Sequence, residues 1–189
     1  MVEIRPVSET DFRAVVDVVR SVFIEYGFGW EEGDYYADLY DPISHYPAPG
    51  GFWVAVCDGT VVGTVGLEVF SPVPSLPPSL NGVATMPHVT GFPTHATLFE
   101  GKMRVAGADC SLERLYLNKE CRGRGVGHAL FQTALEAART QGCKRMEIWS
   151  DKLLVSAHAL YGRSGATLVA DRRCDDPDES PEWGLCLQL

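Results

Sequence analysis

The stretch from Leu112 to Gly142 constrains the fold of this chain more than any other part of its sequence. Alternating side chains from Leu112 to Leu117 predict a strand beside a functional surface. A polar turn and the run RGRGVG follow, and apolar residues then recur at helical spacing until Gly142, which can end a helix. The stretch is therefore predicted to be a strand, a glycine-rich turn and a helix.

Glycines at the start of this predicted helix indicate that a ligand approaches the main chain closely. Glycine inside a helix costs about 1 kcal/mol relative to alanine. The free N–H groups of a helix N-terminus bind phosphate, and arginines beside them add charge-assisted donors. The turn therefore predicts a phosphate-binding loop formed by Arg122, Gly123, Arg124, Gly125, Val126, Gly127 and His128.

This turn differs from two other kinds of phosphate-binding loop. A Walker loop ends in Gly-Lys-Ser/Thr, whereas His128 and Ala129 follow Gly127 here. A dinucleotide fingerprint reads Gly-x-Gly-x-x-Gly, and the glycines here are spaced two and two. Glu147 or Asp151 lies where a ribose-binding acid would sit, so a dinucleotide-binding oxidoreductase stays a lesser alternative, although repeated βαβ units are lacking.

The order of strand, turn, glycine loop and helix resembles the acetyl-CoA-binding segment of the GCN5-related N-acetyltransferase (GNAT) superfamily. Arg122, Gly125 and Gly127 fill its pattern Arg/Gln-x-x-Gly-x-Gly/Ala. The run SAHALYGRSGA at 156–166 resembles the second motif of the family, with Ala166 in place of a phenylalanine. Leu154 stands where many members carry an asparagine that contacts the cofactor.

The resemblance implies an α/β fold with a central mixed, mostly antiparallel sheet flanked by helices, in one GNAT domain over residues 1–189. Residues 71–109 form an insertion that is atypical of the family, and we interpret it as a substrate-specifying lid. Periodicity and turn signals predict helices near 12–26 and 156–165 and a short helix within 27–39. They predict strands at 2–6, 52–57, 61–70, 144–150, 167–174 and 183–189, with the Asp58-Gly59 turn forming a hairpin. Residues 97–106 could form a strand or a small hairpin.

The resemblance also implies a function: transfer of an acetyl group from acetyl-CoA directly to a primary amine of a small molecule or peptide. Pantetheine would pair with the main chain of Leu115, Tyr116 and Leu117, and the Leu117 N–H would polarise the thioester carbonyl. Tyr161 would be the general acid, and Ser156 or Asp151 could replace the missing asparagine contact. A catalytically silent acyl-CoA-binding sensor is the main alternative.

Glu113 is the predicted general base, because strict alternation places it on the same side of its strand as Leu115 and Leu117. An ion pair between Glu113 and a nearby arginine is an equally weighted interpretation. Glu31, Glu32 and Asp34 either meet the substrate ammonium or form a solvated helix start. His88 and His95 fit no metal-binding spacing.

The composition limits the classes of partner that this chain can have. The net charge of −9, from 16 basic and 25 acidic residues, argues against nucleic acid and mildly favours an amine substrate. Apolar runs are too short for a membrane span and the N-terminus lacks a signal peptide, so we expect a cytoplasmic protein without a membrane partner. Six scattered cysteines predict reduced thiols, without a disulfide framework or metal site. A homodimer is left open.

Overall fold

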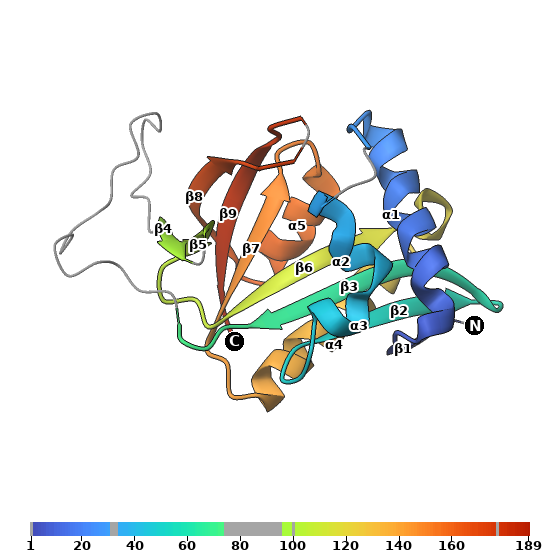
Figure 1. Ribbon diagram of the computed structural model, residues 1–189, viewed down its shortest axis with the longest axis horizontal. Coiled ribbons are helices and arrows are strands. Elements are labelled where there is room, and N and C mark those ends of the chain that lie inside the picture. Colours follow the sequence, from blue (N-terminus) through green and yellow to red (C-terminus); the bar gives the residue numbers. More distant parts are fainter. Residues whose placement is uncertain (1, 31–33, 74–95, 100, 177) are drawn as a thin grey trace, which may run out of the picture.

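The computed structural model describes residues 2–30, 34–73, 96–99, 101–176 and 178–189. Within these residues, seven strands form one sheet in the order β1-β2-β3-β6-β7-β9-β8, and β4 and β5 form a separate hairpin (Figure 1). The strands are β1 (Val2–Pro6), β2 (Gly51–Cys57), β3 (Thr60–Val69), β4 (Ala96–Phe99), β5 (Lys102–Val105), β6 (Cys110–Leu117), β7 (Arg145–Asp151), β8 (Thr167–Arg173) and β9 (Pro181–Gln188).

Helices cover both faces of the sheet. Helices α1 to α3 lie in front of the sheet in Figure 1, and α4 and α5 lie behind it. The predicted mixed α/β fold is confirmed, and the predicted elements at 2–6, 12–26 and 144–150 match β1, α1 and β7 closely. The helices are α1 (Phe12–Tyr26), α2 (Ala37–Tyr40), α3 (Pro42–His45), α4 (Val126–Thr140) and α5 (Val155–Arg163).

Each face of the sheet carries its own hydrophobic core. The face that we call the α4 face packs Leu112 and Met146 against the inner side of α4, including the fully buried Leu130 and Phe131. The opposite side, here called the α1 face, packs Val54 and the ring of Tyr116 against the valines of α1. Full burial of one leucine or phenylalanine side chain contributes about 1.5–3 kcal/mol, so these stripes hold α1 and α4 on the sheet.

One strand pair departs from the antiparallel pattern. Strands β6 and β7 are the only parallel neighbours among the described strands, and they pair only from Cys110–Met146 to Leu112–Ile148. A doubly wound sheet needs repeated parallel βαβ units. Glu147, one of the two acids considered for ribose, is completely buried and accepts the N–H of Val105. The dinucleotide-binding alternative is therefore wrong at the level of the fold.

Part of the insertion, the span 74–95, lies outside the described residues. His88 and His95 belong to this span. The end of the insertion forms the β4–β5 hairpin, so of the strand or small hairpin considered for 97–106 the structure has the hairpin. Arg104 on β5 is buried and bonds to Glu147 of β7 and Glu68 of β3, so the hairpin is attached to the main sheet.

The six thiols are free, and four of them are buried. No helix in the described part of the chain is both long and apolar enough to cross a membrane.

Candidate active site

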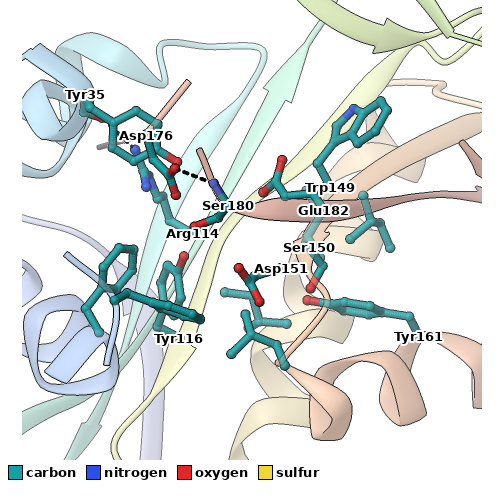
Figure 2. A pocket seen from close by; sticks show the side chains of 16 residues that line it. Tyr35, Arg114, Tyr116, Trp149, Ser150, Asp151, Tyr161, Asp176, Ser180 and Glu182 are labelled. Carbon is teal, nitrogen blue, oxygen red and sulfur yellow. Dashed lines mark hydrogen bonds between the residues drawn. The ribbon is translucent and has the colours of Figure 1, made fainter. Parts of the chain in front are cut away.

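A cleft opens in the sheet where β6 and β7 diverge. Past Leu112 and Ile148 the two strands stop pairing, although β6 continues to Leu117 and β7 to Asp151. Residues from both strands, from α5 and from the β8–β9 connection line the cleft (Figure 2). Main-chain groups on the β7 side of β6 therefore lie where an extended ligand could pair with them.

A β-bulge at Arg114 changes which side chains of β6 share a face. Arg114 has a φ of 49°, and the β3–β6 register shifts beside it. Its guanidinium donates two hydrogen bonds of 2.8 Å to Asp38 of α2, which stabilise this conformation. The bulge places Leu115 and Leu117 in the core of the α4 face, whereas Glu113 lies beside Gly66 and Tyr46 on the α1 face. The expected placement of Glu113 beside Leu115 and Leu117 was therefore wrong, because strict alternation cannot anticipate an inserted residue.

The main-chain groups of Leu117 point away from β3. Asn118 donates its N–H to the carbonyl of Val62, one residue beyond the Gly63–Leu117 pair. In an antiparallel ladder this makes Gly63 and Leu117 a non-hydrogen-bonded pair, so the N–H and C=O of Leu117 point away from β3. The carbonyl accepts from the Arg122 side chain at 3.1 Å. The Leu117 N–H is thus directed to the side on which a ligand between β6 and β7 would lie.

The glycine loop lies at the same end of β6. Gly123 and Gly125 have φ values of 73° and 81°, and no atom lies within 4 Å of a Cβ built on either residue. Helix α4 starts at Val126 directly behind this loop, and Gly123, Arg124, Gly125 and His128 are exposed. The first four N–H groups of a helix have no partner within the helix. Together these features leave an open loop at a helix start, which is the kind of surface that can bind an anion.

Tyr161 reaches the cleft from helix α5. It is 4% exposed, its ring lies 5.5 Å from that of Phe131, and its hydroxyl points towards Ser150 (Figure 2). Burial, with a smaller effect of Tyr116, raises the pKa of Tyr161 above its ordinary value, so the phenol keeps its proton at neutral pH. Ser156 is exposed in the first turn of α5.

The comparison with known proteins agrees with this geometry. The profile of the acetyltransferase (GNAT) family matches residues 15–166. The chain belongs to this family. The N-acetyltransferase YjgM of Escherichia coli (strain K12), described as uncharacterized, is 28% identical over 158 residues, which cover 82% of this chain and 75% of that protein.

Solved structures show the same fold. A GNAT-family acetyltransferase from Staphylococcus aureus Mu50 superposes with a TM-score of 0.69 at 16% identity, covering 100% of this chain and 99% of that one. The PaiA N-acetyltransferase from Thermoplasma acidophilum, solved in complex with coenzyme A, gives a TM-score of 0.64 at 15% identity and the same coverage. At these identities the likeness concerns the fold alone.

In this GNAT protein the two loop arginines differ. Arg122 donates two hydrogen bonds of 2.8 Å to Glu25 at the end of α1, in addition to its bond to Leu117. Its guanidinium therefore ties the loop to α1 and β6. Arg124 is exposed and close to the free N–H groups of α4, where it can meet an anion. The long-range partner Glu25 could not be foreseen from the motif.

Glu113 is held in an ion-pair cluster. Its Oε1 accepts from Ser111 at 2.7 Å and lies 3.5 Å from Arg104. Glu113 is not among the residues that line the cleft. The ion pair that was weighed against the catalytic role is therefore present, with Arg104 as its partner.

The α1 side of the cleft has an acidic wall, defined here as Asp151, Asp176 and Glu182. Its one cationic neighbour among the lining residues is Arg114, whose charge is balanced by Asp38. Asp176 and Glu182 were not predicted in this role. The available signal was the acidic run DDPDESPE at 175–182, which was interpreted only as a connection between strands. Glu31, Glu32 and the side chain of Asp34 lie outside the described residues.

Proposed function

We propose that this protein transfers an acetyl group from acetyl-CoA directly to the primary amine of a small molecule or peptide. The observation that carries the proposal is the divergence of β6 and β7 beside the glycine-rich start of α4. This arrangement gives an extended cofactor both a strand edge and an anion-binding helix start. A Salmonella typhimurium relative of the same fold, yncA, was solved with acetyl-CoA, at a TM-score of 0.64 and 14% identity.

Each part of acetyl-CoA has proposed partners in this chain. The pyrophosphate binds the N–H groups of the loop from Gly123 to His128, with Arg124 adding positive charge and Arg122 holding the loop. The pantetheine pairs with the main chain of Leu115, Tyr116 and Leu117, and its outer end passes Ser156. The Leu117 N–H donates to the thioester oxygen, where negative charge develops during attack.

Tyr161 is proposed as the general acid that protonates the departing thiolate. Its hydroxyl faces the cleft, and its raised pKa keeps the phenolic proton available. The reaction then needs no covalent enzyme intermediate, because the amine attacks the thioester carbon itself. The acidic wall on the α1 side supports a cationic amine as the acceptor.

Calorimetry and a turnover assay test the proposal. Purified protein is titrated with acetyl-CoA, CoA and NAD, and thiol release from acetyl-CoA is measured over a panel of alkylamines, polyamines and peptides. We expect binding of CoA and acetyl-CoA, none of NAD, and an acetylated amine that mass spectrometry identifies. Tight CoA binding without turnover on any amine would favour the silent sensor instead.

A further inference from the structure

The cleft runs through the sheet, so its two ends belong to opposite faces. Leu115, Leu117 and Tyr161 belong to the core of the α4 face. Tyr116 packs in the core of the α1 face, and Trp149 packs beside the β4–β5 hairpin. With the thiol and its acid at Tyr161, the amine must reach the thioester carbon from the α1 side. A group that removes the amine proton must therefore line the cleft on that side.

Glu182 meets this requirement. It lies on β9 directly opposite Asp151 of β7, it lines the cleft, and its side chain is 13% exposed. Leu185 and Leu187 on the same strand pack in the core of the α4 face, whereas Cys186 packs on the other side. Because side chains alternate along a strand, Glu182 and Cys186 share a face, which is the α1 side.

Arg172 fixes the orientation of this carboxylate. Its Nε donates to Oε2 of Glu182 at 2.7 Å, and its Nη1 donates to the carbonyl of Met103 at 2.8 Å. The guanidinium lies 4.2 Å from the centre of the Trp149 ring. Within the described part of the chain, Oε2 of Glu182 accepts a hydrogen bond and Oε1 accepts none. Oε1 is therefore left for a ligand in the cleft.

The other carboxylates nearby already serve the local structure. Asp176 accepts the N–H of Ser180 at 2.8 Å, and Asp151 accepts the N–H of Leu153 at 2.7 Å, so both hold turns. Glu113 is bound to Ser111 and Arg104. Burial raises the pKa of Glu182 above its ordinary value, against the lowering effect of Arg172, and Glu113 and Asp176 raise it further. A carboxylate with a raised pKa is a better proton acceptor near neutral pH.

We propose that Glu182 is the general base for the acceptor amine and that Arg172 is its positioning residue. The inference rests on the proposed acetyl transfer. Oε1 takes one proton from the substrate ammonium and passes it to water. The neutral nitrogen forms a C–N bond with the thioester carbon, the C–S bond breaks, and the thiolate takes the Tyr161 proton. The second proton lost by the nitrogen returns through water to the Tyr161 oxygen.

The test is the pH dependence of kcat/KM for Glu182→Gln. An alkylammonium has a pKa of about 10.4, so at neutral pH almost every acceptor must lose a proton. We expect a loss of about 10²–10⁴-fold at pH 7. The acidic limb that Glu182 sets in the wild type should be replaced by a rate that rises up to the pKa of the amine, so the deficit should shrink towards pH 10 as the amine deprotonates in solution. The acetyl-CoA Kd from calorimetry should stay within threefold, which also shows that the variant is folded.

Matched variants separate this role from a structural one. Glu136→Gln makes the same chemical change at an exposed position of α4 and should keep the wild-type profile. Glu182→Asp should recover part of the rate. Arg172→Met should move the acidic limb to higher pH, because the charge that lowers the pKa of Glu182 is removed.

An unchanged profile for Glu182→Gln, or loss of the limb only in Glu113→Gln, overturns the assignment. A wild type that turns over no amine defeats the proposed function instead, which is a distinct result.

Discussion

Replacing Arg104 tests how the β4–β5 hairpin is attached to the sheet. Its guanidinium bonds to Glu147 at 3.0 Å and to Glu68 at 2.6 Å. The Glu147 side chain is 0% exposed, whereas that of Glu68 is 38% exposed. If Arg104 is removed, Glu68 can therefore be solvated by water, but Glu147 cannot. Arg104→Met keeps an apolar stem but leaves Glu147 buried without its cation. We expect the free energy of unfolding to fall by about 3–5 kcal/mol. At 2–4 °C per kcal/mol for a chain of this size, Tm should fall by about 6–20 °C.

The pH dependence of this loss has a definite sign. Burial raises the pKa of Glu147 above its ordinary value, and the Arg104 charge opposes that rise. The folded state therefore binds more protons than the unfolded state between the two pKa values, and stability falls as pH rises through this window. Removing Arg104 raises the pKa of Glu147 in the folded state further, so the pH range over which stability falls extends to higher pH. The deficit of Arg104→Met should consequently be smaller at pH 5 than at pH 8.

Urea unfolding followed by tryptophan fluorescence, at pH 5 and pH 8, measures the deficit. The control is Arg104→Met combined with Glu147→Gln, which removes the buried charge yet leaves an oxygen to accept the Val105 N–H. The double variant should recover part of the loss at pH 8. A deficit below 1 kcal/mol at pH 8, or one equal at both pH values, would refute the role given to the Arg104–Glu147 pair.

Two further predictions concern the cofactor. Gly125→Leu and Gly142→Leu each place a side chain at a φ near 80° with no protein atom within 4 Å of the new Cβ, so both should cost about 1–2 kcal/mol of stability. Only Gly125→Leu should weaken CoA binding, by tenfold or more in calorimetry, and equal affinities would remove the loop as the phosphate site. Tyr161→Phe should lower kcat by about 10²-fold while the acetyl-CoA KM changes less than threefold, and an unaltered kcat would exclude Tyr161 as the acid.

Local patterns predicted most of the fold because they depend on neighbours in sequence. The valines of α1 and the apolar stripe of α4 repeat at helical spacing, and each stripe is buried in the structure. Asp58 and Gly59 have φ values of 48° and 80°, as a tight hairpin turn requires. The glycine loop was predicted for the same reason: glycine permits its left-handed residues, and the helix begins one residue later.

Features made by distant partners could not be predicted in this way. The bulge at Arg114 depends on Asp38, which lies 76 residues earlier, and it reverses the side on which Glu113 was expected. Arg122 matches a cofactor motif, yet its charge is paired with Glu25, 97 residues away. A strand register and an ion pair across the fold leave no periodic signal, so the sequence indicated the cofactor side of the cleft and missed its acidic wall.

The contact from the β4–β5 hairpin through Arg172 to Glu182 explains why this side of the cleft was hard to predict. The Met103 carbonyl on the hairpin accepts from Arg172, and Arg172 in turn holds Glu182 in the cleft. The β4–β5 hairpin at the end of the insertion therefore helps to position Glu182 through its main chain. Main-chain carbonyls are identical in every residue, so such a contact depends on where β5 lies and leaves no residue signature. A change that moves β5 should alter the proposed proton acceptor, Glu182, before it alters CoA binding, since the glycine loop lies at the far end of β6.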